Sequence, residues 1–124
     1  MSQNLEINAT NLKIVNKVWG WEKTIINTEE YCGKILFIKE GHSTSWHYHN
    51  LKDECFYVQE GVLKVIYSQE NDFDSAETKV LTPSQSLHMP RRMRHSLVAI
   101  KDAYIFEFST HHQDQDSIRL LSGY

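Results

Sequence analysis

The sequence predicts an all-β fold, a sandwich or barrel built from short strands. Runs rich in aromatic and β-branched residues recur along the chain, and they follow one another at close, regular spacing. Polar or glycine-containing turns separate these runs. One segment near the C-terminus, residues 113–121, has instead the composition of a short helical or irregular tail.

The expected strands can be placed in order along the chain. They are 17–28, 32–40, 44–49, 54–59, 62–67, 79–81, 86–89, 95–100 and 103–109. Segments 54–59 and 62–67 flank Glu60 and Gly61, which predicts a hairpin that turns at Gly61. The polar stretch 68–78 predicts a solvated loop.

Length and composition indicate one ordered domain. The 124 residues fit a single domain, 1–124, with a polar segment at 1–12 that we expect to be loosely ordered. Hydrophobic residues make up 40% of the chain and aromatic residues 11%, which argues against disorder. The formal net charge is -3, so the chain lacks the excess of basic residues that is typical of nucleic-acid-binding proteins.

The expected compartment is the cytoplasm. No apolar run approaches the length of a membrane span, and the first residues lack the basic and apolar regions of a secretion signal. Cys32 and Cys55 form neither a disulfide framework nor a C-x-x-C pair. We therefore expect two free structural thiols and no membrane partner.

A pattern of histidine and glutamate between Gly41 and Gly61 carries the chemistry. The stretch GHSTSWHYHNLKDECFYVQEG contains His47 and His49 two residues apart, and Glu54 five residues later. Alternate side chains of a strand share a face, so both histidines point inward while Trp46 and Tyr48 point outward. A turn over 50–53 lets Glu54, at the start of the next strand, return to the same point. Phe56 and Val58 then also face the interior.

A further ligand lies downstream, where Pro90 precedes His95 by five residues. Proline constrains the backbone entering a turn, and His95 then opens a strand. Neutral imidazole suits divalent transition metals, and a carboxylate adds an oxygen ligand. The sequence therefore predicts one divalent ion (Zn, Ni, Mn or Fe) on His47, His49, Glu54 and His95. The alternatives are four ordinary polar residues on half-exposed strands, or a vestigial site that binds metal weakly or not at all.

These residues resemble the two motifs of the cupin superfamily. Gly-x5-His-x-His-x4-Glu-x6-Gly matches its first motif, and Pro-x4-His matches the core of its second. The resemblance implies a double-stranded β-helix, or jelly-roll barrel, with the metal inside, and a homodimer. Ser84 and Arg92 replace the usual glycines of the second motif, and Ala99 replaces its usual asparagine.

A second, sparser resemblance links the chain to the cupin domain of type II mannose-6-phosphate isomerases. It rests on Trp19-Gly20, on Lys39-Glu40-Gly41 and on the segment Asp116-Ser117-Ile118-Arg119-Leu120. That family often has glutamine where His47 stands here. This resemblance implies a sugar or sugar phosphate as the small-molecule substrate.

Residues outside the motifs suggest further roles. Arg92 and Arg94, beside Arg91, are candidates for binding a substrate phosphate or carboxylate at the barrel mouth, since arginine pairs bidentately with such oxygens. The alternative is a solvated turn. We expect surface positions for His42, His88, His111 and His112. Asp114, Asp116 and Arg119 are expected in a solvated end segment, or in one that closes a mouth of the barrel. Trp19, Trp21, Trp46 and Tyr48 are expected between the sheets or in a dimer interface rather than stacked on a sugar.

Three functions are compatible with this sequence. The first is a sugar or sugar-phosphate isomerase or epimerase that acts through a metal-stabilised enediolate. The catalytic residue is not identified, and Glu54, Lys34 and Lys39 are conceivable proton carriers. The second is an iron-dependent dioxygenase acting on a small organic acid. The third is a non-catalytic sugar-binding or regulatory module, which the altered second motif favours.

Overall fold

The computed structural model describes residues 12–124, and in this part of the chain nearly all regular structure is β. The expectation of a loosely ordered segment over 1–12 falls, except for Leu12, outside the described residues. The strands are β1 (Ile14–Lys17), β2 (Gly20–Asn27), β3 (Cys32–Ile38), β4 (Trp46–His49), β5 (Glu54–Ser68), β6 (Glu77–Leu81), β7 (Ser86–Met89), β8 (Arg94–Ser109) and β9 (Ser117–Leu121). Two single 3-10 turns, η2 (Phe73–Ser75) and η3 (Asp114–Asp116), complete the elements of this part.

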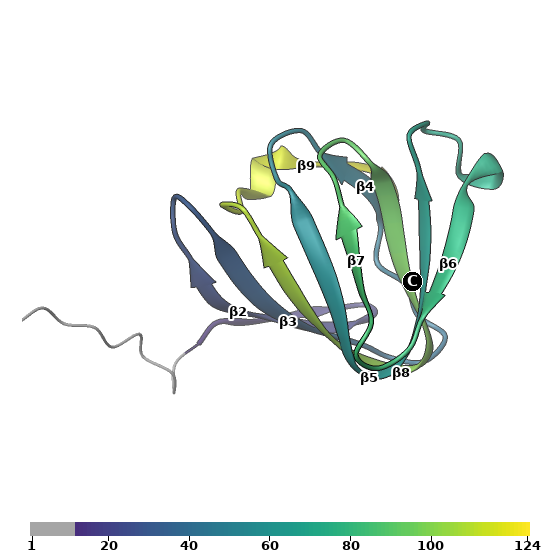
Figure 1. The fold of residues 1–124 in the computed structure, drawn as a ribbon, viewed down its shortest axis with the longest axis horizontal. Helices are drawn as coiled ribbons and strands as arrows, with labels where there is room; N and C mark the ends of the chain where they lie inside the picture. Colours follow the sequence, from purple (N-terminus) through teal and green to yellow (C-terminus); the bar gives the residue numbers. More distant parts are fainter. Residues whose placement is uncertain (1–11) are drawn as a thin grey trace, which may run out of the picture.

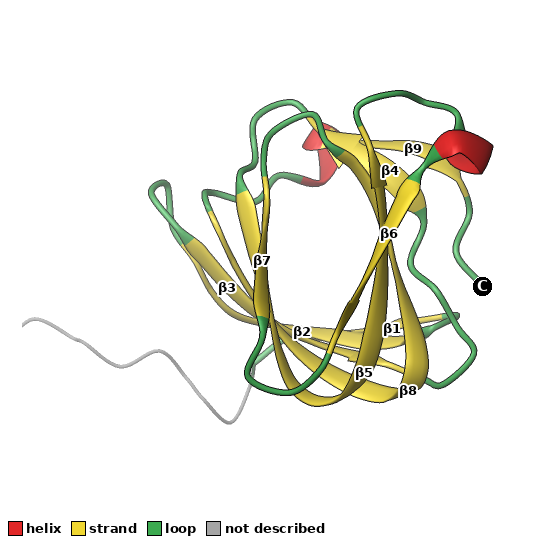
Figure 2. Ribbon diagram, turned by 45° about the vertical axis from the view of Figure 1, so that its right-hand side comes forward, coloured by secondary structure: helices red, strands yellow, loops and turns green. Residues whose placement is uncertain are grey.

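The strands form two antiparallel layers that curl around a common interior (Figure 1, Figure 2). One layer contains β1, β2, β3, the second half of β8, the first half of β5 and β7. The other contains β9, β4, the first half of β8, the second half of β5 and β6. The all-β jelly-roll prediction is thereby confirmed. No helix of residues 12–124 is long and apolar enough to cross a membrane.

The two longest strands, β5 and β8, pass from one layer into the other, and they bend together at Gly61. Gly61 has a φ of 90°, and a Cβ placed there would clash with the carbonyl oxygen of Asp102 on β8. Such a backbone conformation and close approach favour glycine. The expected hairpin at Gly61 is therefore wrong: the chain bends without reversing, and 54–68 is one strand.

The second cupin motif keeps its turns without its glycines. Ser84 and Arg92 are the two non-glycine residues of the described chain with positive φ, at 74° and 68°. These are the positions where the motif usually carries glycine. Turn shape has thus been retained at the cost of about 1–2 kcal/mol of local strain per residue.

The core is built by strands whose successive side chains point alternately into the interior and outward. In β3 the buried positions are Cys32, Lys34, Leu36 and Ile38, and the intervening side chains face outward. Phe56 and Val58 of β5 are 1% and 0% exposed, as the placement of Glu54 predicts. Cys32 and Cys55 are free thiols, also as predicted.

The C-terminal tail contains more regular structure than its sequence suggests. After the η3 turn, residues 117–121 form β9, which pairs antiparallel with β4. The pairing places Arg119 opposite His47 and Ser117 opposite His49. The tail therefore forms one wall beside the strand that carries both histidines.

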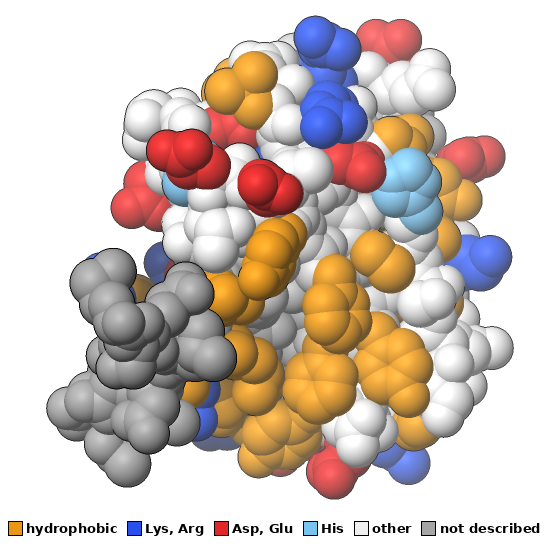
Figure 3. Space-filling view, turned by 60° about the vertical axis from the view of Figure 1, so that its left-hand side comes forward, with side chains coloured by type: hydrophobic (Ala, Val, Ile, Leu, Met, Phe, Trp, Pro, Cys, Tyr) orange, Lys and Arg blue, Asp and Glu red, His pale blue; other side chains and the backbone are white. Residues whose placement is uncertain are grey.

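Aromatic side chains cover much of the outer face of the first layer (Figure 3). Trp21, Phe37 and Tyr104 are cross-strand neighbours with ring centroids 4.9–6.2 Å apart, and Tyr57 stacks on Phe106 at 6.0 Å. Antiparallel sheets usually turn a polar face to water, and this one does not.

The bend at Gly61 yields a stability prediction. We expect Gly61→Ala to lower the free energy of unfolding by about 3 kcal/mol or more, because left-handed strain adds to the clash with Asp102. Gly41 is the matched control: its φ is 81°, but a Cβ there meets no atom within 4 Å. Gly41→Ala should therefore cost only about 1 kcal/mol. Chemical denaturation of both variants checks this, and equal losses would contradict it.

Candidate metal centre

Three strands bring the predicted ligands together, with His49, His95 and Glu54 buried and His47 half-buried. His47 and His49 lie on β4, His95 lies beside His47 as its cross-strand partner on β8, and Glu54 is the first residue of β5. One ring nitrogen from each histidine lies within 4.8 Å of the other two. Glu54 adjoins this trio, with Oε2 3.1 Å from His95 Nε2 and Oε1 3.8 Å from His49 Nε2.

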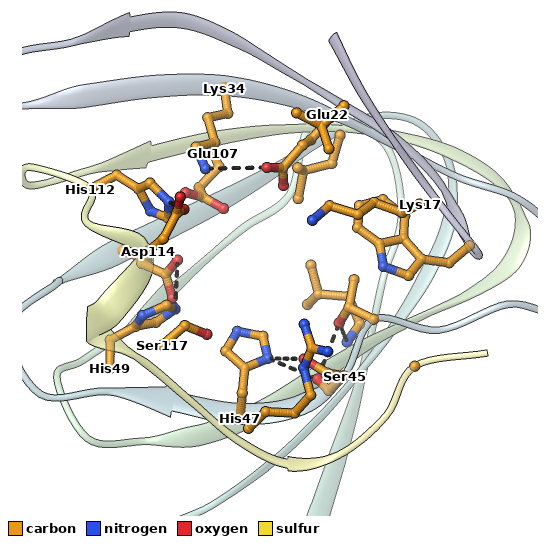
Figure 4. Close-up of a pocket in the computed structure, with 18 of the residues that line it drawn as sticks. Lys17, Glu22, Lys34, Ser45, His47, His49, Glu107, His112, Asp114 and Ser117 are labelled. Atoms are coloured by element: carbon orange, nitrogen blue, oxygen red, sulfur yellow. Dashed lines mark hydrogen bonds and ion pairs between the residues drawn. The ribbon is translucent and has the colours of Figure 1, made fainter. Parts of the chain in front are cut away.

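Hydrogen bonds to the backbone orient two of the three imidazole rings. His47 Nδ1 lies 2.9 Å from the carbonyl oxygen of Ser45, and His95 Nδ1 lies 2.9 Å from that of Met93 (Figure 4 shows the first). A carbonyl oxygen can only accept, so each Nδ1 carries the proton and donates it. Each neutral ring then presents the lone pair of Nε2, which is the arrangement second-shell bonds impose on ligating histidines.

The protonation of His95 matters at its contact with Glu54. In the neutral ring, the lone pair of His95 Nε2 and the carboxylate oxygen of Glu54 would both be acceptors, 3.1 Å apart, with both residues buried. Two such acceptors repel unless a proton or a cation lies between them. The donor set of imidazole nitrogens and a carboxylate is one that divalent transition metals accept.

Burial lowers the pKa of two of the histidines, and neighbouring groups lower the pKa of the glutamate. Burial, together with His95 and His49, holds the pKa of His47 well below its usual value. The pKa of His49 is lowered to about 4, mainly by burial. Burial alone would raise the pKa of Glu54, but His95 and Lys52 outweigh it and hold that pKa well below the ordinary range. At neutral pH His47 and His49 are therefore neutral bases beside one carboxylate anion.

Lys52 anchors the outer edge of the cluster. Its Nζ lies 3.0 Å from Glu54 Oε1 and 3.1 Å from Glu107 Oε2, and the residue is 3% exposed. Burial would lower the pKa of Lys52, but the two carboxylates raise it above the usual value. Glu107 is also buried, and its pKa is raised by that burial despite the nearby ammonium. Lys52 thus contacts Oε1 of Glu54, and Oε2 of the same carboxylate faces His95.

Asp116 holds the turn that positions Lys52. Its carboxylate accepts hydrogen bonds from the backbone N–H groups of Asn50, Leu51 and Lys52, each 3.0 Å long, and it lies 3.8 Å from His49 Nδ1. The residue is 7% exposed. The expectation that Asp116 belongs to a solvated segment is therefore wrong, because the η3 turn folds it back beneath the β4–β5 connection.

The cluster forms one wall of a cavity of about 1020 Å³. Opposite the histidines, Lys34 pairs with Glu22 at 3.6 Å, and His112 bonds to Lys52 and Asp114 (Figure 4). Apolar side chains complete the walls, namely Trp19, Leu36, Phe56 and Leu97. Of the three conceivable proton carriers, Glu54 and Lys34 line the cavity and Lys39 does not.

The structure places the two predicted substrate-binding arginines away from the cavity. Neither Arg92 nor Arg94 belongs to its lining. Arg94 donates to Asn71 Oδ1 and to the carbonyl oxygen of Arg92, and its guanidinium lies 3.9 Å from the centre of the Tyr48 ring. Their role in substrate binding stays a prediction.

Sequence reasoning missed Lys52, Glu107 and His112. Glu107 had a usable signal, because the inward alternation of Ala103 and Ile105 continues to it. A charged residue at an inward position of a strand requires a partner. His112 was expected at the surface and instead contacts Lys52 across 60 residues of sequence, which nothing in the local pattern indicates.

The buried ion network yields a second stability prediction. We expect Lys52→Met to lower the free energy of unfolding of metal-free protein by about 3–5 kcal/mol, because two carboxylates lose their shared cation. Lys34→Met is the control, since its partner Glu22 is more accessible to water, and should cost about 1 kcal/mol. Adding Glu107→Gln to Lys52→Met should recover part of the loss. Denaturant titrations measure all three, and a milder effect at Lys52 than at Lys34 would refute the assignment.

Solved structures similar to this one share its fold at low identity. The capsular polysaccharide assembling protein CapF from Staphylococcus aureus is 19% identical with a TM-score of 0.76, over 89% of this chain and 34% of that one. KdgF from Halomonas sp. is 18% identical with a TM-score of 0.73, over 92% and 98%. A variant of Bacillus subtilis oxalate decarboxylase is 15% identical with a TM-score of 0.82, over 97% and 33%. The chain thus spans about a third of CapF and of the decarboxylase.

The family of the chain follows from its sequence motifs together with this fold. No curated protein matches the chain. The family model of the cupin domain matches residues 35–110, the segment that contains β4, β5, both motifs and all four candidate ligands. The chain belongs to the cupin family.

Proposed function

We propose that the protein binds one divalent metal ion on His47, His49, His95 and Glu54. The observation that carries the proposal is the convergence of ligand atoms: one ring nitrogen from each of the three histidines lies within 4.8 Å of the other two, and a carboxylate oxygen of Glu54 lies 3.1 Å from His95 Nε2. A divalent cation at that point would be shared by these atoms. The Lys52 ammonium compensates only the outer oxygen of Glu54.

We further propose that this centre serves a sugar or sugar-phosphate isomerase or epimerase. A bound divalent ion would act as a Lewis acid toward two substrate oxygens. The apolar wall of Trp19, Leu36 and Phe56 would exclude water, and the polar wall of Lys34, Glu22 and Glu107 would receive hydroxyl groups. Proton transfer between adjacent carbons needs a nearby base, and Glu54 and Lys34 are the candidates carried over from the sequence that line the cavity.

Two independent resemblances support carbohydrate chemistry. Residues spread over the whole chain resemble the cupin domain of type II mannose-6-phosphate isomerases. One protein of similar fold is described as a capsular polysaccharide assembling protein. A cavity of about 1020 Å³ accommodates a sugar phosphate.

A homodimer and a cytoplasmic location remain part of the proposal. The aromatic outer face of β2, β3, β8 and β5 is the surface that a second copy would bury (Figure 3), since apolar patches of this kind mark interaction sites. The two unpaired thiols are compatible with a reducing compartment.

The metal proposal makes a direct prediction. Purified protein should bind one equivalent of Zn²⁺, Ni²⁺, Mn²⁺ or Fe²⁺, and His47→Ala or His95→Ala should weaken that affinity by about 100-fold or more. His88→Ala is the control, because His88 is exposed and pairs with Asp53 outside the cluster. Elemental analysis and calorimetric titration give both quantities. An unchanged metal affinity in His47→Ala and His95→Ala would contradict the proposal.

The activity proposal is tested on metal-loaded protein with mannose 6-phosphate and fructose 6-phosphate in D₂O. We expect interconversion with solvent deuterium incorporated at the carbon that exchanges its proton, and loss of both in His95→Ala. Proton NMR measures the two together. Tightly bound iron with oxygen uptake on a small organic acid would favour a dioxygenase instead. Stabilisation by sugars without turnover would favour a binding module.

A further inference from the structure

The charges that line the cavity do not balance. Each of its carboxylates has a bonded partner: Glu22 pairs with Lys34, Glu54 and Glu107 share the single cation of Lys52, and Asp114 bonds to His112, whose pKa is lowered by burial. Three cations of the lining, Arg119, Lys17 and Lys13, have no carboxylate within ion-pair distance in residues 12–124. The five lysine and arginine cations of the lining thus exceed its four carboxylates by one, and three of them make no ion pair in the described chain.

Arg119 is the most specific of these three cations. It lies on β9 as the cross-strand partner of His47, and paired residues of an antiparallel sheet project from the same face. Neighbouring strands are about 5 Å apart, so the arginine stands directly beside the proposed metal centre. Its guanidinium makes no hydrogen bond or ion pair within the described chain, which leaves its planar fork of donors available.

Lys17 approaches the same space from the other layer. It is the last residue of β1, and it lines the same cavity, across from His47 and Ser45 (Figure 4). The two cations therefore enter the cavity from β9 and from β1. Arg94 differs from both, because its donors are already used by Asn71 and by the carbonyl oxygen of Arg92.

We infer that Arg119 and Lys17 form an anion-binding subsite for the terminal phosphate or carboxylate of a small polyhydroxylated ligand. Arginine binds either group bidentately, and a lysine adds a point charge. The ligand's hydroxyl oxygens would then lie toward the histidines. That orientation rests on the proposed metal centre, whereas capture of the anionic end depends only on Arg119 and Lys17.

The test compares three probes of one carbon skeleton: D-glucitol, D-gluconate and D-glucitol 6-phosphate. Calorimetric titrations use the full chain, both Zn²⁺-loaded and metal-free. We expect at least one anionic probe to bind about ten-fold or more tightly than glucitol. Arg119→Gln should remove most of that advantage and leave glucitol binding unchanged, and Lys17→Gln should reduce it in part. The tighter of the two anions identifies the group that the subsite takes.

Two further variants make the result specific. Lys101→Gln removes the same charge from an exposed position outside the cavity and should have no effect. Arg94→Gln tests the competing site, and an affinity loss there without one in Arg119→Gln would overturn the inference. Thermal melting confirms that each variant is folded. Absence of any preference for the anionic probes in the wild-type chain would overturn it as well.

The outcomes separate this inference from the metal proposal. If Zn²⁺ does not bind but Arg119→Gln still weakens the anionic probes, the subsite stands and the metal centre fails. If Zn²⁺ binds to the histidines while Arg119→Gln binds both anions like the wild type, the metal centre stands and the subsite fails.

Discussion

Imidazole nitrogens and a carboxylate crowd together in the interior of the barrel, and the neighbouring structure is organised around that crowding. Backbone carbonyls of Ser45 and Met93 turn two imidazole rings so that their lone pairs face the cluster. Lys52 compensates one oxygen of Glu54, and the other remains 3.1 Å from His95. Buried nitrogen and carboxylate acceptors in such an arrangement are costly unless a proton or a cation lies between them. The cost is what makes the cluster a candidate for metal binding.

The two layers of the barrel contribute different chemistry to this cluster. The layer containing β4 and the first half of β8 supplies the imidazole nitrogens. The layer containing the first half of β5 and the second half of β8 supplies the buried carboxylates Glu54 and Glu107. The bend of β5 and β8 at Gly61 lets the same two strands belong to both layers. The backbone conformation at Gly61, about 20 Å along β5 from Glu54, therefore decides whether the imidazole nitrogens and the carboxylates meet.

Charge compensation divides the cavity into a satisfied part and an unsatisfied part. The carboxylates are bonded to lysine or histidine, and the contacts of Lys52 with Glu54 and Glu107 are buried. Arg119 and Lys17 are not matched within the described chain, and both residues are exposed. Fixed pairs maintain the shape of a site, whereas free cations attract a ligand. Our proposals for metal, sugar and anion assign these two functions to different residues of one cavity.

Local patterns in the sequence were sufficient for most of the strands, the inward faces of His47, His49 and Glu54, and the cupin fold. Strand periodicity and motif spacing depend on neighbouring residues, so they can be read from the chain directly. Tertiary structure alone decided that β5 bends where a hairpin was expected and that Asp116 and His112 fold back against the β4–β5 turn. It also placed Arg119, rather than Arg92 or Arg94, beside the histidines. These outcomes, apart from the bend, depend on contacts between segments about 60 or more residues apart, and no local pattern encodes such contacts.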